Sequence, residues 1–133
     1  MDQNNSTNKV EVRKEYYADG SILRKTQCKD GKKHGTDEWF YESGALEFEI
    51  PYENGGRHGM AKSYYKSGAL WAETPYVNGV IHGIEKFYYE SGSLKREIQF
   101  IDGERNGVEK IYDESGALLA EDGVWVSKAK SNA

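Results

Sequence analysis

The chain has 133 residues, of which 37% are hydrophobic and 13% aromatic, enough for one domain of ordinary size but not comfortably for two. Its 22 acidic residues outnumber the 18 lysines and arginines, and the net charge of −4 argues against general affinity for nucleic acid or anionic membranes. No apolar stretch approaches the roughly 18 residues of a transmembrane helix. Cys28 is the single cysteine, which excludes an intramolecular disulfide and a cysteine-based zinc site.

The two ends of the chain differ from its middle. Residues 1–9 and 127–133 are rich in Ser, Asn and Lys and offer too few apolar side chains to offset the entropy of ordering. We therefore expect disordered tails around one repeat domain over residues 10–126. The start of the chain has no charged segment followed by an apolar one, so no signal peptide is predicted. The compartment stays open: cytoplasmic for a full-length chain, exported or periplasmic if a signal peptide has been removed.

Between these tails the sequence repeats every 24 residues. Thirteen of the fifteen glycines fall in three columns with this step and no insertion: Gly20, Gly44, Gly68, Gly92 and Gly116; Gly31, Gly55, Gly79 and Gly103; Gly35, Gly59, Gly83 and Gly107. The first column follows Ser or Asp and the second follows Asp or Asn, which are turn signals. In chain order, we therefore predict hairpin turns at residues 19–20, 43–44, 67–68, 91–92 and 115–116.

The segments between the turns are typical of strands. They are aromatic or β-branched runs, such as 39–41 and 86–89, and give two strands per repeat, about ten in all. No stretch has a sustained helical period with caps, so no helix is predicted.

Alternation along the strands sets a register. With Ser43-Gly44 at the apex of its hairpin, Tyr41 would face Leu46 and Trp39 would face Phe48 on one apolar face. The same register places Lys against Glu on the opposite, polar face, in the pairs Lys62–Glu73, Lys86–Glu97 and Lys110–Glu121; Glu38 against Glu49 is an exception.

The recurring phrase H-G-x-x-x-x-[FY]-Y-x-S-G-x-L-x-x-E, best kept in units 34–55, 58–79 and 82–103, resembles the MORN repeats, specifically the bacterial MORN-variant family. The resemblance spans roughly residues 10–126. It implies consecutive antiparallel hairpins in one long twisted sheet, and many family members are labelled the antitoxin component of a toxin–antitoxin module. The family offers no catalytic residue to carry over.

We therefore predict an all-β fold, with tandem 24-residue MORN-like hairpins in one extended, twisted antiparallel sheet. Leucine-rich repeats have a similar period but need several leucines per unit. A parallel β-helix is the remaining alternative, although it needs no sharp reversal in each coil.

Two columns could carry chemistry. His34, His58 and His82 would lie about 10 Å apart on successive hairpins, too far for one metal ion, and a turn-stabilising role is favoured. The column of Glu49, Glu73, Glu97 and Glu121 could supply acid–base pairs, but a solvated, ion-paired face suits it better. Cys28 is expected to be a small core residue. We predict no enzyme, no metal and no cofactor, since no catalytic triad or phosphate-binding motif is present.

The aromatic residues of the polar face are the candidate partner-binding set: Phe40, Tyr64, Trp71, Tyr88 and Tyr112. In the predicted register Tyr64 faces Trp71 across the turn, as the largest aromatic pair of that face. Exposed aromatics rimmed by charge are suited to protein partners, and cross-strand packing is the competing interpretation. No helix is available to cover the apolar face, so a partner, a second copy or curling of the sheet is expected to cover it.

The expected function is a non-catalytic protein-binding module that acts as an antitoxin or immunity-like component, with a protein such as a toxin as its partner. The alternative is a lipid- or envelope-associated scaffold. The net charge disfavours the alternative, whereas the basic loop Lys32-Lys33 favours it.

Overall fold

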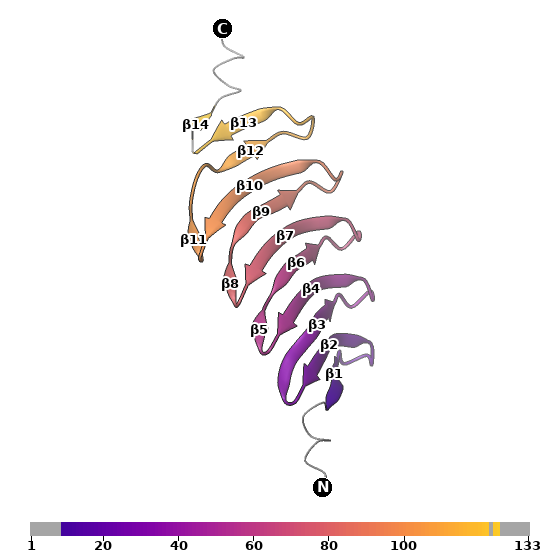
Figure 1. The fold of residues 1–133 in the computed structure, drawn as a ribbon. Helices are drawn as coiled ribbons and strands as arrows, with labels where there is room; N and C mark the ends of the chain where they lie inside the picture. Colours follow the sequence, from indigo (N-terminus) through magenta and orange to yellow (C-terminus); the bar gives the residue numbers. More distant parts are fainter. Residues whose placement is uncertain (1–8, 123, 126–133) are drawn as a thin grey trace.

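A computed structural model describes residues 9–122 and 124–125, which form one antiparallel sheet without helices (Figure 1). The strands are β1 (Val10–Tyr16), β2 (Ile22–Lys29), β3 (Lys32–Phe40), β4 (Leu46–Glu53), β5 (Gly56–Arg57), β6 (Gly59–Tyr64), β7 (Leu70–Val77), β8 (Val80–Ile81), β9 (Gly83–Tyr88), β10 (Leu94–Ile101), β11 (Glu104–Arg105), β12 (Lys110–Tyr112), β13 (Leu118–Glu121) and β14 (Val124–Trp125). They pair in the order β1-β2-β3-β4-β6-β7-β9-β10-β12-β13-β14, while the short β5, β8 and β11 pair with β4, β7 and β10. The predicted all-β hairpin array is confirmed. The predicted disordered tails lie, apart from Lys9, outside the described residues.

The turn of the first glycine column closes a tight loop. Gly44 donates its backbone N–H to the carbonyl of Tyr41 at 2.9 Å, and Tyr41 donates to the carbonyl of Ala45 at 2.8 Å. Gly44 has a φ of 96°, a left-handed conformation that glycine adopts without strain. This pattern is that of a type I turn followed by a glycine bulge. It recurs at each of the five turns of the first glycine column, so the turns predicted from that column are confirmed.

The second turn is a two-residue reversal. Asn54 and Gly55 have φ values of 51° and 89° and connect Glu53 to its partner Gly56. Two successive left-handed residues are the signature of a type I′ turn, whose twist matches that of the flanking strands. Because both turns suit the strand twist, consecutive hairpins add to one sheet without an intervening helix.

The predicted register is correct along the strand interiors and wrong beside the first turn. Trp39 pairs with Phe48 as expected, but Leu46 pairs with Phe40 and not with Tyr41. The cause is a bulge one residue after Leu46, where the extra residue Glu47 has no partner on β3. The same bulge recurs in the other hairpins that a first-column turn closes, at the start of β2, β7, β10 and β13.

The register divides the side chains between two faces, because residues paired across antiparallel strands point to the same side. We call one side the Trp39 face; its central row is Arg24, Trp39, Phe48, Ser63, Ala72, Phe87, Arg96, Ile111 and Ala120. The other is the Lys62 face; its central row is Lys25, Glu38, Glu49, Lys62, Glu73, Lys86, Glu97, Lys110 and Glu121. The three predicted Lys–Glu pairs and the Glu38–Glu49 exception are confirmed.

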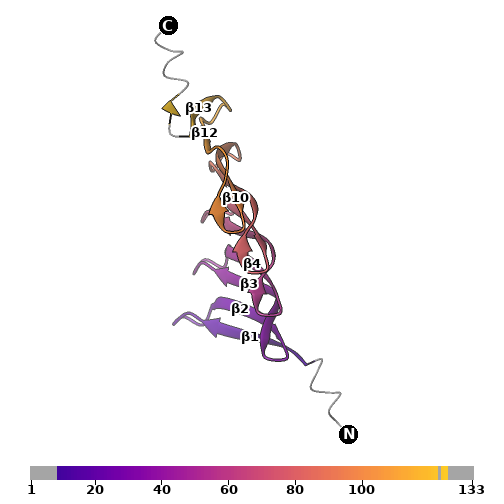
Figure 2. The same cartoon turned by 60° about the vertical axis from the view of Figure 1, so that its left-hand side comes forward.

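Hydrogen bonds between neighbouring hairpins compensate for a small core. In the described part of the chain, the buried hydrophobic residues are Cys28, Ala72, Ile98 and Ala120. A column of tyrosines just before the turns joins each hairpin to the next, through bonds from the hydroxyls of Tyr17, Tyr41, Tyr65 and Tyr89 to the carbonyls of Phe40, Tyr64, Tyr88 and Tyr112. The sheet twists but remains open, with β1 at one end and β13 and β14 at the other (Figure 2). Both faces are therefore accessible to a partner.

Candidate functional site

A groove of about 410 Å³ lies on the Trp39 face. It crosses strands β2 to β7, and the side chains of its lining are aromatic, ionic and small or apolar: Arg24, Lys33, Asp37, Trp39, Phe48, Ile50, Tyr52, Arg57, Ala61, Ser63 and Tyr76. We call this cavity the Arg57 groove. Its position follows from the register, because the central row of this face carries Trp39 and Phe48 on one side but only Ser63 and Ala72 on the other. Small residues beside large ones leave the hollow.

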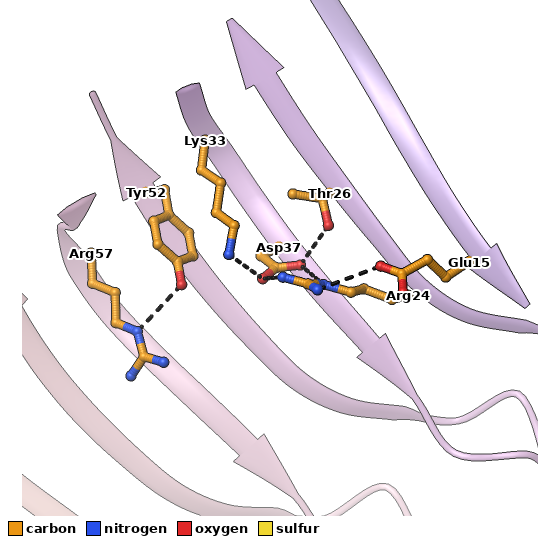
Figure 3. Close-up of polar contacts among 7 residues, drawn as sticks. All are labelled: Glu15, Arg24, Thr26, Lys33, Asp37, Tyr52 and Arg57. Atoms are coloured by element: carbon orange, nitrogen blue, oxygen red, sulfur yellow. Dashed lines mark hydrogen bonds and ion pairs between the residues drawn. The ribbon is translucent and has the colours of Figure 1, made fainter. Parts of the chain in front are cut away.

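One wall of the groove is a buried ionic cluster (Figure 3). The Asp37 carboxylate accepts two hydrogen bonds from Arg24, each 2.9 Å long, and one of 3.0 Å from the Thr26 hydroxyl. Lys33 lies 3.8 Å from the same carboxylate. Asp37 is 1% exposed, and burial alone would raise its pKa, but the bonds from Arg24 and Thr26 and the two cations lower it instead. This wall is internally satisfied and rigid.

The opposite wall holds Arg57 in a different environment. Its Nε donates to the Tyr52 hydroxyl at 3.4 Å, and one terminal nitrogen donates to the Tyr76 hydroxyl at 2.9 Å. The guanidinium also lies 5.2 Å from the centre of the Tyr76 ring. None of the ion pairs between described residues involves Arg57. The groove therefore has a positioned cation that no carboxylate of the described residues pairs with.

Aromatic rings support the cations of the groove. The Arg24 guanidinium lies 4.2 Å from the centre of the Trp39 ring, and the Lys33 ammonium lies 4.8 Å from that of Tyr52. Such contacts favour a cation near a ring face and fix long side chains that would otherwise be mobile. An aromatic, apolar and cationic lining of this kind is suited to binding an apolar group next to an anion.

Sequence reasoning missed this groove, although a signal was present. At the 24-residue step, Lys33 aligns with Arg57, Ile81 and Arg105, and Asp37 aligns with Ala61, Glu85 and Glu109. The glycine and aromatic columns attract attention because they are constant. The columns of Lys33 and Asp37, in contrast, change from repeat to repeat, and the groove lies where they change.

The tyrosines predicted for the partner surface make hydrogen bonds within the sheet. The Tyr64, Tyr88 and Tyr112 hydroxyls donate to the carboxylates of Glu49, Glu73 and Glu97, at 3.2, 2.6 and 2.8 Å. Burial, and then the bonded glutamate, raises the pKa of Tyr88 and of Tyr112 to about 12. Phe40 lies on the same face, with the Lys25 ammonium 6.0 Å from the centre of its ring. These bonds support the packing interpretation, and the role of the tyrosines in binding stays a prediction.

Trp71 does not join those tyrosines, and the prediction that it faces Tyr64 is wrong. Tyr64 pairs with Leu70, and Trp71 is the extra residue of the bulge. In such a bulge the extra side chain turns toward the same side as its successor, here Ala72 of the Trp39 face. There the Trp71 ring meets Phe87 edge to face, with centres 5.7 Å apart, and 40% of Trp71 stays exposed.

The histidine column stabilises turns at two of its positions. His58 Nδ1 accepts a 3.2 Å bond from the backbone N–H of Asn78, and His82 Nδ1 accepts the equivalent bond from Asp102. His34 Nδ1 is buried and has no hydrogen-bond partner among the described residues. Within residues 9–122 and 124–125, no group of three or more His, Cys, Asp or Glu side chains is arranged to hold a metal ion.

Cys28 is 1% exposed and takes the small core position expected for it. It occupies the column of Tyr52, Tyr76 and Phe100 and pairs with Lys33 across the β2–β3 hairpin. In the described part of the chain no helix is long and apolar enough to span a membrane.

Comparison with known proteins supports the architecture directly. Comparison with curated proteins gives no match. The profile of the MORN repeat variant matches four consecutive segments, at residues 33–54, 57–78, 81–102 and 105–124. Each matched segment contains one first-column turn with the strands on either side of it. The first three segments end at the following two-residue turn and the fourth ends in β14, so the matches follow the observed hairpins. Repeats of this kind are generally binding modules. The matches cover well over half of the sequence in an unbroken tandem series, and the chain therefore belongs to the MORN repeat variant family.

Proposed function

We propose that this chain is a non-catalytic module that binds a protein partner through the Trp39 face. The observation that carries the proposal is the Arg57 groove, where a cation without a carboxylate partner lies beside Phe48 and Ile50. Protein interfaces favour this combination of aromatic and arginine side chains at their centre. The groove lies on rigid strands in the middle of the array, so that little ordering is needed when a partner binds.

The chemistry of the two faces favours a protein over a lipid surface. Anionic membranes attract clusters of like positive charge. The central row of the Lys62 face mixes lysines with glutamates, and the groove itself contains Asp37. With a net charge of −4, the chain presents no extended basic surface in these rows. The lipid- or envelope-associated scaffold is therefore the second candidate function.

The specific form of the proposal is an antitoxin- or immunity-like role, which the family resemblance suggests. A module without catalytic groups would neutralise a toxin by covering a functional surface of it. An open sheet with an aromatic groove offers such a cover, and its varied side chains would select the toxin.

Affinity capture with the tagged full chain, followed by reconstitution with the purified candidate partner, tests the proposal. We expect a complex of defined stoichiometry by size-exclusion chromatography and a protective effect when the partner is toxic to cells that co-express the chain. Co-sedimentation with vesicles of phosphatidylcholine and phosphatidylserine is the parallel assay. Vesicle binding without any reconstituted protein complex would contradict the proposal and favour the scaffold function.

A further inference from the structure

Three columns of the 24-residue repeat form an ionic motif that occurs twice on the Trp39 face. In the β2–β3 hairpin Arg24, Lys33 and Asp37 cluster together. Seventy-two residues later, three repeats on, Arg96, Arg105 and Glu109 form the same cluster. Lys33 lies 3.8 Å from Asp37 and Arg105 lies 2.9 Å from Glu109, and in both cases the acid is four positions after the cation.

The first of the two repeats between these clusters keeps the cation and lacks the acid. Arg57 occupies the position of Lys33 and Arg105, but the residue four positions later is Ala61, which also lines the groove. The methyl group of Ala61 leaves open the space that a carboxylate fills beside the equivalent cations. The next repeat shows the reverse change, with Ile81 in place of the cation and Glu85 accepting a 2.7 Å bond from Thr74.

The groups around this space are prepared to donate hydrogen bonds. Arg57 uses two of its N–H groups on the Tyr52 and Tyr76 hydroxyl oxygens, and its other N–H groups have no partner among the described residues. Both tyrosines accept from Arg57, which leaves their own hydroxyl protons available to a ligand. A planar guanidinium with two hydroxyls beside it matches the geometry of a carboxylate.

We propose that the protein partner supplies the missing carboxylate: an Asp or Glu side chain of an extended partner segment binds Arg57 over Ala61. An apolar neighbour of that acid then packs against Phe48 and Ile50 in the same groove. This inference rests on the proposed function and adds to it the chemical class of the segment that is recognised.

The equivalent positions in the chain favour a side-chain carboxylate over a phosphate. Asp37 and Glu109 show that this backbone geometry holds a carboxylate against the cation of its own repeat. In addition, Asp37 lies in the wall of the groove and would repel the higher charge of a phosphate or an anionic lipid headgroup. An apolar segment with a single acid fits both the charge and the lining.

A peptide selection on the full chain tests this inference. A library of random peptides displayed on phage is selected against the wild-type chain, and an enriched peptide is synthesised with its acidic residue and with Glu→Gln or Asp→Asn at that position. Binding is measured by fluorescence polarisation for the wild type, Arg57→Gln, Ala61→Glu and the control Arg105→Gln. Thermal unfolding checks that each variant is folded.

Ala61→Glu is the sharper of the two variants, because it places a carboxylate within the chain at the spacing used by Glu109. We expect it to keep or raise the melting temperature while it competes with the peptide for Arg57. Arg57→Gln, Ala61→Glu and the amide peptide should each weaken binding about tenfold or more, which corresponds to about 1.4 kcal/mol. Arg105→Gln removes an equivalent cation outside the groove and should leave peptide binding unchanged.

Three results would overturn the inference. The first is that the enriched peptides share no recurring acid. The second is that they bind Arg57→Gln and Ala61→Glu with the same affinity as the wild type. In both cases the proposed protein-binding function would stand. If selection enriches nothing while vesicles containing phosphatidylserine bind the wild type but not Arg57→Gln, the ligand of Arg57 is a lipid headgroup. In that case the inference fails together with the proposed protein-binding function.

Discussion

The two faces of the sheet use the same backbone in different ways. On the Lys62 face, residues recur at the 24-residue step: Lys62, Lys86 and Lys110 each pair with a glutamate, and Tyr64, Tyr88 and Tyr112 each donate to one. On the Trp39 face, the equivalent positions change from Arg24 to Phe48, Ala72, Arg96 and Ala120. Constant residues join one hairpin to the next, whereas variable residues shape the groove.

A single-layer sheet must both hold its repeats together and present a recognition site, and here the two faces divide these roles. A bond that connects neighbouring repeats is needed at each junction, so the residue types that make it are repeated along the array. A recognition site is needed once, and a change in one repeat is enough to create it. In such a chain, departures from the repeat are therefore the places to search for specificity.

The largest expected effect comes from breaking the ionic cluster at Asp37. We expect Asp37→Ala to lower the free energy of unfolding by about 3 kcal/mol, because it leaves Arg24 partly buried without its carboxylate. Urea unfolding measures this loss. Glu85→Ala is the control and should cost clearly less, because Glu85 is in the same column but among the described residues its side chain bonds only to Thr74. Equal losses would show that the cluster contributes no more than an ordinary member of its column.

The same carboxylate makes this difference depend on pH. Because the pKa of Asp37 is lowered in the folded chain, its ionised form stabilises the fold above the unfolded pKa of about 3.9. That stabilisation is lost as the pH falls through the folded pKa. The stability difference between wild type and Asp37→Asn should therefore shrink below about pH 4. A difference that stays constant down to the acid transition would contradict the assigned ionic role.

The second prediction sharpens the assignment of Trp71 to the Trp39 face. We expect Trp71→Ala to cost roughly 1.5 kcal/mol, since it removes the edge-to-face contact with Phe87. A double-mutant cycle with Phe87→Ala should give a coupling energy of about 1 kcal/mol, and a cycle with Tyr64→Ala should give almost none. Coupling to Tyr64 instead of Phe87 would place Trp71 on the Lys62 face and contradict this assignment.

The third prediction concerns the hydrogen bonds that join hairpins. Tyr65→Phe removes the hydroxyl that donates to the Tyr88 carbonyl at 2.6 Å, and we expect a loss of about 1 kcal/mol. Tyr16→Phe serves as control, because Tyr16 is 56% exposed and its hydroxyl bonds to no described residue. Thermal unfolding of both variants would show whether the tyrosine column holds the array together.

The smallest effect is expected on the Lys62 face. Lys86 lies between Glu73 and Glu97 in register, so Lys86→Glu creates three adjacent acids and should cost roughly 0.5 kcal/mol. The cost should fall in high salt, since these side chains are partly exposed and their charges are screened. A loss that does not respond to salt would show that packing, and not charge, holds this row.

The sequence was sufficient to predict the hairpins, both kinds of turn and the Lys–Glu pairs, because each depends on residues that recur and on backbone preferences of single residues. Gly44 and Asn54 adopt the left-handed conformations that their turns require. The position of Trp71 was not predictable in the same way. A bulge shifts the pairing by one residue, and with a period of two such a shift moves a side chain to the other face. The Arg57 groove depends on several unlike residues meeting across strands, which no periodic pattern reports.

The bonds between hairpins also have a consequence for how the chain reaches its folded state. The side-chain bonds of Tyr41, Tyr64 and His58 reach 23 residues ahead, 15 residues back and 20 residues ahead, so each connects adjacent units only. A nascent chain can thus complete one junction as soon as two units have left the ribosome, without waiting for distant segments. Because each unit contacts only its neighbours, folding can begin in one pair of units and extend to the next along the array.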